Sequence, residues 1–581
     1  MAIKTVRSVL FGALILSLLV SACGGGDTSP AATATPRGPG STVTSVATAA
    51  PTATQVTTPA GQLRMAIETI AGYSLLPGVS VAAGHIDIMF DPMIALRDDG
   101  GLEPKNSVVS SWTSSADFKT WTVKTRDGVV FHNGAKATAK DLKFTLDFYM
   151  HSGSNATATS YTLRQASTES IASPDDSTVV YTLKTADIFF PYRYFTHHGI
   201  GTTGQWLQSK AHLEAQGVDL TAKTLDLSRA VKAPVGSGPY RYVSDAANQE
   251  TVMEAIPQTH WLWGMPRIKT ATIRIIPEPA TRLALVKSGE VETSNITRAP
   301  IPEMKRLGYD IMYHKDARNA DIQIYEQWKD SYAGSGKNPL ADVRVRQALS
   351  LAIDRKALVD QFLLGYGTPE ISPARIWDLA YQAKPVPPQD LNKAKALLQE
   401  AGFANGFTLT EYQFGVAGLI PEGPDMMEAI ALWWERLGIK VERKGVDQAA
   451  TMIGVHNKGF SAPTVSGIWG GGNLTVSAGA RVGSDGKIAR GPTPPNHLEE
   501  DIDNLNIAIG QAASREEYTR AVRQWADISM QKVVVIPVFN WGHIFAVKKG
   551  LGGDKWNVGR GGNGTLYNLN QLLTGRFDIL R

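Results

Sequence analysis

The chain of 581 residues contains one cysteine, Cys23, close to its N-terminus. A single cysteine cannot form an internal disulfide bond, so no disulfide framework supports the fold. The net charge is also small: the chain has 58 lysines and arginines and 54 aspartates and glutamates, which gives a formal net charge of +4. So small an excess gives no support to nucleic-acid binding. After Cys23 there is no run of roughly eighteen apolar residues, so we expect no transmembrane helix in that part of the chain.

The residues before Cys23 have the pattern of an export signal. Two basic residues and no acidic one precede an apolar stretch at positions 9–20, which is too short for a stable transmembrane helix. The tetrapeptide VSAC that ends at Cys23 resembles the bacterial lipobox, in which the cysteine is acylated and becomes the mature N-terminus. We therefore expect residues 1–22 to be a lipoprotein signal peptide and Cys23 to be lipidated. The alternative is an ordinary secretory signal with an incidental cysteine.

Residues 24–60 differ in kind from the rest. They are mainly glycine, alanine, serine, threonine and proline, with one acid and one base. Such a segment cannot bury enough apolar surface to offset its ordering entropy. We expect residues 23–60 to be a lipid-anchored, disordered linker with a root-mean-square reach of roughly 30–35 Å.

The body that follows has both strand and helix signals. A first strand is expected at 63–68, and Trp121 and Val123 alternate with polar neighbours as in a half-buried strand. Thr138 can cap a helix whose apolar residues lie on one side.

Further helices are expected after Asp342 and Asp390, and Gly402 has the position of a C-terminal cap. Another helix lies between predicted strands at 407–414 and around 439–441, which gives a β-α-β unit of an α/β fold. Its apolar stripe, interpreted as core rather than as a ligand site, is Met426, Ile430, Trp433 and Leu437.

Several segments, in order along the chain, resemble the bacterial extracellular solute-binding proteins of family 5, the peptide-, nickel- and oligosaccharide-binding components of ATP-driven importers. The segment TWTVKTRDGVVFHNGAKATAKDLKFTLDFY (120–149) is similar to that family's signature, and PVGSGPYRYV (234–243) resembles its Gly-Pro-Tyr turn. NPLADVRVRQALSLAIDRKALVDQFLLGYGTP (338–369) and IPVFNWGHIFAVKKGLGG (536–553) resemble later family segments. The resemblance extends from about residue 63 to residue 553.

The resemblance implies an α/β fold of two lobes joined by two hinge crossings, with a ligand cleft between the lobes and an extra subdomain in the first. The crossings would lie near 276–278 and 535–537. The implied division is lobe I at 61–277 with the extra subdomain at about 87–228, lobe II at 278–536, and a return to lobe I at 537–581.

The resemblance also implies a function without catalysis. The protein would capture a small solute, an oligopeptide or an oligosaccharide, by hinge closure. It would deliver that solute to an ABC permease and its ATPase, as a monomer anchored by lipid to the outer face of the cytoplasmic membrane. No cofactor or metal is implied. A ligand-sensing surface lipoprotein that acts with a membrane receptor is the alternative.

Candidate ligand-binding residues follow from the family's cleft-lining segments. A late aromatic-and-glycine loop and the segment near the second crossing supply most of them, with single aromatics in an early loop and at 371–381. The expected residues are Tyr73, Trp377, Trp469, Gly470, Asn473, Asn540, Trp541 and His543.

One departure from the family pattern concerns the ligand. Peptide-binding members have an acidic residue shortly after the Trp-Gly pair, where it binds the free ammonium group of the peptide. Here residues 469–483 contain no aspartate or glutamate, and an unpaired ammonium in a closed cleft is costly. The departure favours a neutral polar ligand such as a sugar, whose rings suit aromatic faces.

Other motifs give weaker evidence for a function. The adjacent pair His197 and His198 lacks the spaced histidine or cysteine partners of a metal site. Ser237 lacks the second glycine of a G-x-S-x-G nucleophile elbow. GRGGNG (559–564) lacks the preceding strand of a dinucleotide-binding loop. We expect His132 to stabilise a turn.

Overall fold

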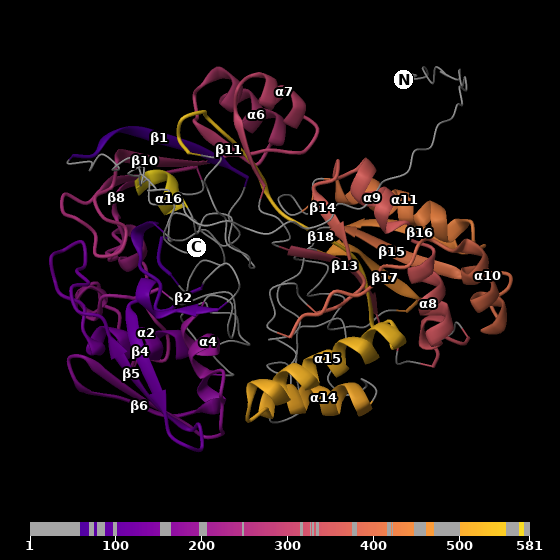
Figure 1. The fold of residues 1–581 in the computed structure, drawn as a ribbon, viewed down its shortest axis with the longest axis horizontal. Coiled ribbons are helices and arrows are strands. Elements are labelled where there is room, and N and C mark those ends of the chain that lie inside the picture. The colour runs from indigo at the N-terminus through magenta and orange to yellow at the C-terminus, as the bar shows by residue number, and fades with distance from the viewer. Residues whose placement is uncertain are drawn as a thin grey trace, which may run out of the picture. The chain divides into compact units, whose positions relative to one another are not determined.

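The protein is described from a computed structural model. Strands and helices are coloured along the chain in Figure 1. The structure describes residues 58–68, 75–77, 88–96, 101–151, 164–196, 206–246, 249–313, 318–325, 327, 330–332, 336–374, 380–414, 420, 422–446, 461–469, 500–552 and 569–574.

A seven-stranded sheet forms the centre of the first lobe, in the order β12-β19-β11-β1-β10-β9-β8. Strand β1 runs parallel to β10 and β11, and β19 runs antiparallel to β11 and β12. Helices α6 (Pro279–Ser288) and α7 (Ile301–Arg306) lie beside β11 and β12 (Figure 1). The strands are β1 (Ala60–Ile67), β8 (Tyr240–Ala246), β9 (Glu250–Ala255), β10 (Ile268–Ile275), β11 (Thr293–Asn295), β12 (Asp310–Tyr313) and β19 (Ile544–Val547).

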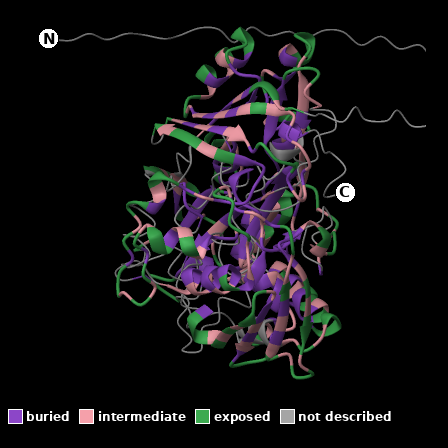
Figure 2. Cartoon of the chain, turned by 90° about the vertical axis from the view of Figure 1, so that its left-hand side faces the viewer, coloured by how far each residue is buried: buried purple, intermediate pink, exposed green. Residues whose placement is uncertain are grey.

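The extra subdomain has its own antiparallel sheet, in the order β4-β5-β7-β6, and its own apolar core. In Figure 2 buried residues occupy the interior of this side of the molecule, and exposed residues lie on its outer loops and helix surfaces. Its elements are β2 (Ala95–Leu96), β3 (Leu102–Glu103), β4 (Val109–Ser114), β5 (Thr120–Thr125), α2 (Ala139–Met150), β6 (Thr168–Asp175), β7 (Thr178–Leu183), α4 (Phe190–Phe195), α5 (Lys210–Ala215) and the 3-10 helices Pro104–Asn106 and Ala230–Lys232.

A six-stranded sheet in the order β14-β18-β13-β17-β15-β16 forms the second lobe. Helices α8 to α11 contribute to its main core, whereas α14 and α15 pack against each other (Figure 1). The elements are β13 (Arg318–Tyr325), the 3-10 helix Pro339–Ala341, α8 (Val343–Leu351), α9 (Arg355–Gln361), β14 (Gly367–Pro369), α10 (Leu391–Glu400), β15 (Thr408–Phe414), α11 (Gly423–Glu435), β16 (Lys440–Val446), β17 (Thr464–Trp469), α14 (Glu500–Gln511), α15 (Arg515–Lys532) and β18 (Val535–Trp541). Helix α16 (Leu569–Thr574) packs near β10 of the first lobe.

The passage between the two sheets differs from the expected positions. After β10 the chain adds α6, β11, α7 and β12 to the first sheet, and only then enters β13. If each lobe is defined by its sheet, the first passage lies between Tyr313 and Arg318 rather than at 276–278. The second lies between Trp541 and Ile544 rather than at 535–537. Strands β11 and β12 return to the first sheet, so a division by sheets differs from the predicted lobe boundaries, which stay a prediction.

Local signals in the sequence fix several helix ends as predicted. Thr138 forms a capping box with Asp141, which satisfies two backbone N–H groups at the start of α2. Asp342 caps α8 through the Arg344 N–H at 2.9 Å, and Asp390 caps α10 through the Lys393 N–H at 2.8 Å. These carboxylates accept hydrogen bonds from N–H groups of the first turn, for which no earlier turn of the helix provides a carbonyl acceptor.

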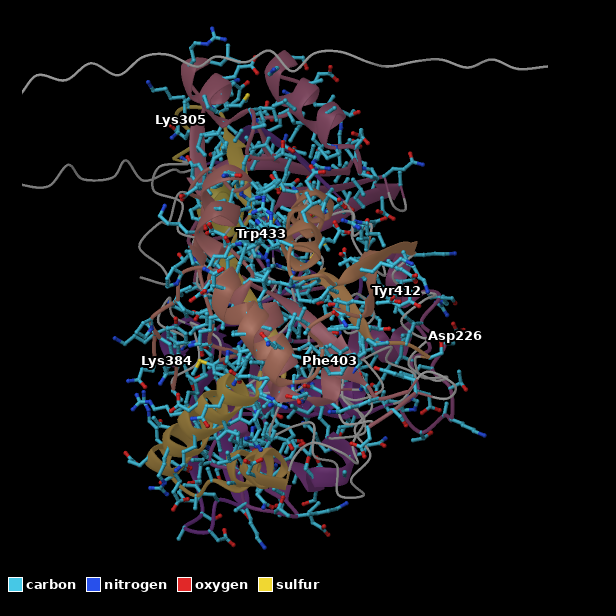
Figure 3. The ribbon with its side chains drawn as sticks, turned by 90° about the vertical axis from the view of Figure 1, so that its right-hand side faces the viewer. Asp226, Lys305, Lys384, Phe403, Tyr412 and Trp433 are labelled. Carbon is cyan, nitrogen blue, oxygen red and sulfur yellow. The ribbon has the colours of Figure 1, made fainter. Side chains whose placement is uncertain are left out.

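The predicted β-α-β unit is also present, because β15 and β16 pair in parallel on either side of α11. The predicted stripe belongs to the core: Met426, Ile430 and Leu437 are buried, and Trp433, labelled in Figure 3, is partly buried and packs against the same core. The adjacent Trp434, which was not predicted, is fully buried. Trp434 Nε1 donates to Leu349 O at 3.0 Å, so the indole N–H is satisfied within the core.

The Gly-Ser-Gly-Pro-Tyr turn packs directly on the backbone of residues 88–90. A Cβ on Gly236 would lie 1.9 Å from Met89 O, and one on Gly238 would lie 2.6 Å from Ile88 O. His132 clamps the same turn: Gly236 N–H donates to Nδ1 at 3.2 Å, and Nε2 lies 3.0 Å from Gly238 O. Burial lowers the pKa of His132 to about 4. The imidazole is therefore a neutral structural group, consistent with the expected role at a turn.

Candidate solute-binding site

The carboxyl ends of the parallel strands in the first lobe lie at the edge from which the chain leaves for the second lobe. Glu68 follows β1 and Asn295 ends β11. Tyr313 ends β12 at the same edge, opposite Ile544 at the start of β19. In α/β sheets, ligands bind beyond the carboxyl ends of the strands. This edge is therefore the part of the first lobe best placed to contact a solute.

The second lobe presents the equivalent edge. Strands β17 and β18 are parallel to each other, since both pair antiparallel with β13, and they end at Trp469 and Trp541. Within β13, Asp321 is opposite Trp469 and Arg318 is opposite Trp541. The linking segments after β12 and β18 thus join the carboxyl edge of one sheet to that of the other.

A charged cluster occupies the first-lobe edge. Asn295 Nδ2 donates to Glu68 Oε2 at 2.7 Å, and Arg282 Nη2 lies 3.9 Å from the same oxygen. Arg282 is 2% exposed and also donates to three backbone carbonyls, those of Ile276, Pro277 and Asn295, at 2.7 to 3.2 Å. The side chain therefore ties together the ends of β10 and β11.

Burial raises the pKa of Glu68 to about 7, against the opposing effects of Arg282, Asn295 and Arg318. Arg318 belongs to the second lobe, so Glu68 interacts electrostatically with both sheets. Since desolvation penalises the charged form, this carboxyl group gains or loses its proton near neutral pH. A carboxyl group of this kind can accept a hydrogen bond from a solute or donate one to it.

A second cluster spans the two lobes beside the second linking segment. Arg298 of the first lobe donates through Nη1 to Glu422 Oε2 at 3.0 Å and through Nη2 to Gly542 O at 3.1 Å. Its guanidinium carbon lies 5.6 Å from the centre of the Trp541 ring, within the range of a cation–π contact. The ring centres of Trp541 and His543 are 5.2 Å apart.

Asn540 is tied into the second lobe. Its Nδ2 donates to Glu370 Oε2 at 3.1 Å, and the same oxygen accepts from Tyr381 Oη at 2.6 Å. Glu370 Oε1 accepts from the N–H groups of Ile371 and Ser372, each at 2.8 Å. All seven residues of β18 are buried. The Asn540 amide therefore fixes the end of β18 against the segment after β14.

The structure brings together three of the predicted site residues, Asn540, Trp541 and His543, at the end of β18. Trp469 ends β17, and its side chain is not among those described. Four other predicted ligand-binding residues and the predicted lipidation site lie outside the described residues: Tyr73, Trp377, Gly470, Asn473 and Cys23.

Sequence reasoning missed four charged residues of this region, Glu68, Arg282, Arg298 and Arg318, and the polar residue Asn295. A usable signal existed for Glu68, because it is the acid that ends the predicted first strand at 63–68. The three arginines have no such signal, since all of them follow the predicted lobe boundary at 277 and none adjoins a predicted strand.

A serine, a histidine and an aspartate lie together elsewhere in the first lobe, but their hydrogen bonds are incompatible with nucleophilic catalysis. His260 Nδ1 accepts from the N–H groups of Leu262 and Trp263, so the ring proton is on Nε2. Nε2 contacts Asp91 Oδ2 at 3.3 Å and Ser237 O at 3.0 Å. No ring nitrogen is left to take a proton from the Ser237 hydroxyl, as a general base must.

Among the residues that the structure describes, no group of three or more histidine, cysteine, aspartate or glutamate side chains is placed to hold a metal ion. Within the same described ranges, no helix has both the length and the apolar character to cross a bilayer.

Comparison with known proteins identifies the family to which the chain belongs. Residues 103–480 match the model of the bacterial extracellular solute-binding proteins, family 5. The chain is 30% identical over 380 residues to the glutathione-binding protein GsiB of Pectobacterium atrosepticum, which covers 63% of this chain and 67% of that protein. It is 29% identical to GsiB of Escherichia coli K12, where the match spans 56% of the relative.

Solved structures show the same fold. An ABC transporter substrate-binding protein of Listeria monocytogenes superposes with a TM-score of 0.71 at 20% identity, covering 88% of this chain and 99% of that one. The periplasmic binding protein DppA of Helicobacter pylori, in complex with the peptide STSA, has a TM-score of 0.66 at 18% identity, covering 88% and 98%. These relatives are binding proteins, which agrees with the expectation that the chain is not an enzyme. The chain belongs to the bacterial extracellular solute-binding proteins of family 5, and its fold is their two-lobed α/β fold.

Proposed function

We propose that this protein is the extracytoplasmic substrate-binding component of an ABC importer. It captures one small solute between the carboxyl edges of its two sheets and presents it to a permease and ATPase complex. The observation that carries the proposal is the convergence of both edges on the two linking segments, with Glu68, Arg298 and Trp541 beside them. In this family's fold, such convergence places a solute where it can contact both lobes at once.

The solute that fits best is a short peptide. Relatives are named for binding glutathione or were solved with a peptide. Charges of both signs lie at the described edges, a carboxyl group at Glu68 and guanidinium groups at Arg298 and Arg318. Arg298 is paired with Glu422, and the Trp541 ring is buried beside it. Residues 469–483 contain no acidic residue that could bind the ammonium group of a peptide. In this proposal Glu68 of the first lobe takes that role. A neutral oligosaccharide is the competing ligand.

Hinge closure would use contacts that already join the lobes. Beside the linking segments, Lys305 (labelled in Figure 3) donates to Tyr366 Oη at 3.3 Å, and the rings of Tyr313 and Tyr366 meet edge to face with centres 5.2 Å apart. At α15, Tyr518 meets Phe189 of the extra subdomain at 4.3 Å between ring centres. Opening the lobes would break one set of contacts while the other acts as a pivot.

We further propose that acylation of Cys23 holds the protein, as a monomer, at the outer face of the cytoplasmic membrane, with the residues between Cys23 and strand β1 as a tether. Mass spectrometry of the membrane-extracted protein tests this directly. The expected product begins at Cys23 and carries acyl chains. A mature N-terminus without lipid would contradict the proposal.

Calorimetric titration of the protein lacking residues 1–23 tests the binding function. The probes are glutathione, the tetrapeptide Ser-Thr-Ser-Ala, maltotriose and a mixed tryptic peptide digest. We expect one site per chain for a peptide probe and at least a tenfold weaker affinity in Trp541→Ala, because the ring and its contact with Arg298 are lost.

The matched control is Trp433→Ala, which removes a partly buried tryptophan from α11 and should leave the affinity unchanged. Binding of maltotriose and of no other probe would support the proposed transport function but show that the ligand is an oligosaccharide rather than a peptide. Binding of no probe would contradict the function.

A further inference from the structure

Arg164 is a buried arginine of the extra subdomain with few hydrogen-bond partners. It lies just before β6, it is 1% exposed, and its Nη1 donates to Tyr194 O at 3.2 Å. The guanidinium carbon is 5.3 Å from the centre of the Tyr194 ring. Within the described part of the chain, Nε and Nη2 are buried without any hydrogen-bond partner. Most of its five donor hydrogens are therefore unsatisfied.

No negative charge compensates this guanidinium among the described residues. Burial lowers the pKa of Arg164, and the ionisable groups that oppose this effect are three tyrosines, Tyr149, Tyr181 and Tyr194. Burial raises the pKa of each phenol, that of Tyr194 to about 12, so all three are neutral. The sequence on either side of these elements, 152–163 and 197–205, contains no aspartate or glutamate.

The tyrosine hydroxyls are also engaged elsewhere. Tyr149 Oη donates to Trp206 O at 3.0 Å, Tyr181 Oη bonds to Thr168 Oγ1 at 2.5 Å, and Tyr194 Oη bonds to the Ser167 hydroxyl. They line the surroundings of Arg164 with polar groups but do not accept hydrogen bonds from it.

Other buried arginines of the same chain show how unusual this is. Arg193, in the same subdomain, pairs with Asp187 at 3.1 Å. Arg346 donates to three backbone carbonyls and Arg355 to three oxygen acceptors, all at 2.8 to 3.0 Å. Each of them has a carboxylate or three acceptors, and Arg164 has one carbonyl.

We propose that Arg164 holds a small monovalent anion of the halide class, bound by Nε and Nη2 on the side away from Tyr194 O. An ionised group that is buried without a partner is strongly disfavoured, and a charge-assisted hydrogen bond to an anion removes that penalty. This anion site has a role separate from solute transport, because it stabilises the extra subdomain around α4. Helix α4 begins one residue after Phe189, whose ring contacts Tyr518 of the second lobe.

Two measurements on the protein lacking residues 1–23 test this site. Thermal unfolding is followed in sodium chloride, sodium bromide and sodium gluconate at equal ionic strength. Crystals soaked in bromide are examined for anomalous scattering. We expect the Tm in either halide to exceed that in gluconate by about 2 °C or more, since a ligand that binds only the folded state raises its stability. We also expect a bromide peak in hydrogen-bonding range of Arg164 Nε and Nη2.

Arg164→Met should abolish the halide dependence of the Tm, whereas the control Arg193→Gln should lower the Tm but keep that dependence. If Arg164→Met does not fold, the proposal is still tested by the salt dependence of the wild-type Tm and by the position of bromide in the soaked crystals. Equal Tm values in all three salts, or a halide effect without bromide at Arg164, would overturn the proposal. Bromide at Arg164 without any effect on Tm would identify an adventitious ion only and would also overturn it.

Discussion

At the scale of single residues, two buried glutamates of the second lobe have opposite surroundings. Glu370 accepts four hydrogen bonds through its two oxygens. Glu411 of β15 is fully buried, and neither of its oxygens has a hydrogen-bond partner within the described residues. The neighbouring Arg443 cannot compensate it, because its guanidinium is already bonded to Glu428 and Glu435 of α11 at 2.7 to 2.9 Å.

Burial raises the pKa of Glu411 to about 7, with smaller opposing effects from Gln413 and Arg443. The folded state therefore prefers the protonated form. Its contribution to stability is fully present below the unfolded pKa of about 4.5 and is lost as the pH rises through about 7. Glu411→Gln should raise the free energy of unfolding at pH 8 by an amount on the order of 3 kcal/mol at most. At pH 4 the same substitution should have little effect.

Denaturant unfolding of wild type and variant at both pH values checks this difference. Glu370→Gln is the matched control, and it should destabilise the protein at pH 8, because an amide cannot accept all four hydrogen bonds. A Glu411→Gln variant that is less stable than wild type at pH 8 would show that the carboxylate has a partner in solution.

The glycines of the Gly-Ser-Gly-Pro-Tyr turn give a second prediction at this scale. Gly236→Ala should lower the free energy of unfolding by about 3 kcal/mol or more, because its Cβ would overlap the Met89 carbonyl. Gly445→Ala on β16, where nothing lies within 4 Å of the added carbon, should be tolerated. Equal stability of the two variants in denaturant unfolding would mean that the turn does not pack on residues 88–90.

At the scale of elements, sequence reasoning worked best where a local rule acts alone. The caps at Thr138, Asp342 and Asp390 were predicted correctly, because each satisfies backbone groups within one turn of its own helix. Gly402 has a φ of 87° after α10, as a left-handed C-terminal cap requires. The periodicity of α11 could not distinguish Trp433 from Trp434, because the angle at which a helix packs on its sheet is set by tertiary contacts.

The cap of α10 can be tested in isolation. Asp390→Ala should lower the free energy of unfolding by about 1 kcal/mol, and Asp390→Ser should retain most of it, since serine also accepts from the N3 backbone N–H. Denaturant unfolding at pH 7 separates the two variants. A loss of equal size in both would assign the role of Asp390 to its charge rather than to its hydrogen bond.

At the scale of the whole molecule, the resemblance of sequence segments predicted the two-lobed α/β fold, but the crossings that it implied at 276–278 and 535–537 differ from the points where the chain passes between the sheets. Strands β11 and β12 contain only three and four residues, too few for a period to be read. The charged residues at the edges, including Arg282 and Arg298, come together only through that topology. Trp541 was a candidate because the segment around it has a family pattern, and its role in the site stays a prediction.

The most direct test of solute binding is native mass spectrometry of the protein lacking residues 1–23, purified without added ligand and then mixed with the tryptic peptide digest. We expect one adduct of small mass per chain, lost after unfolding and weakened in Trp541→Ala. A chain that shows only its own mass, before and after the digest is added, would contradict the claim that this protein binds a solute between its lobes.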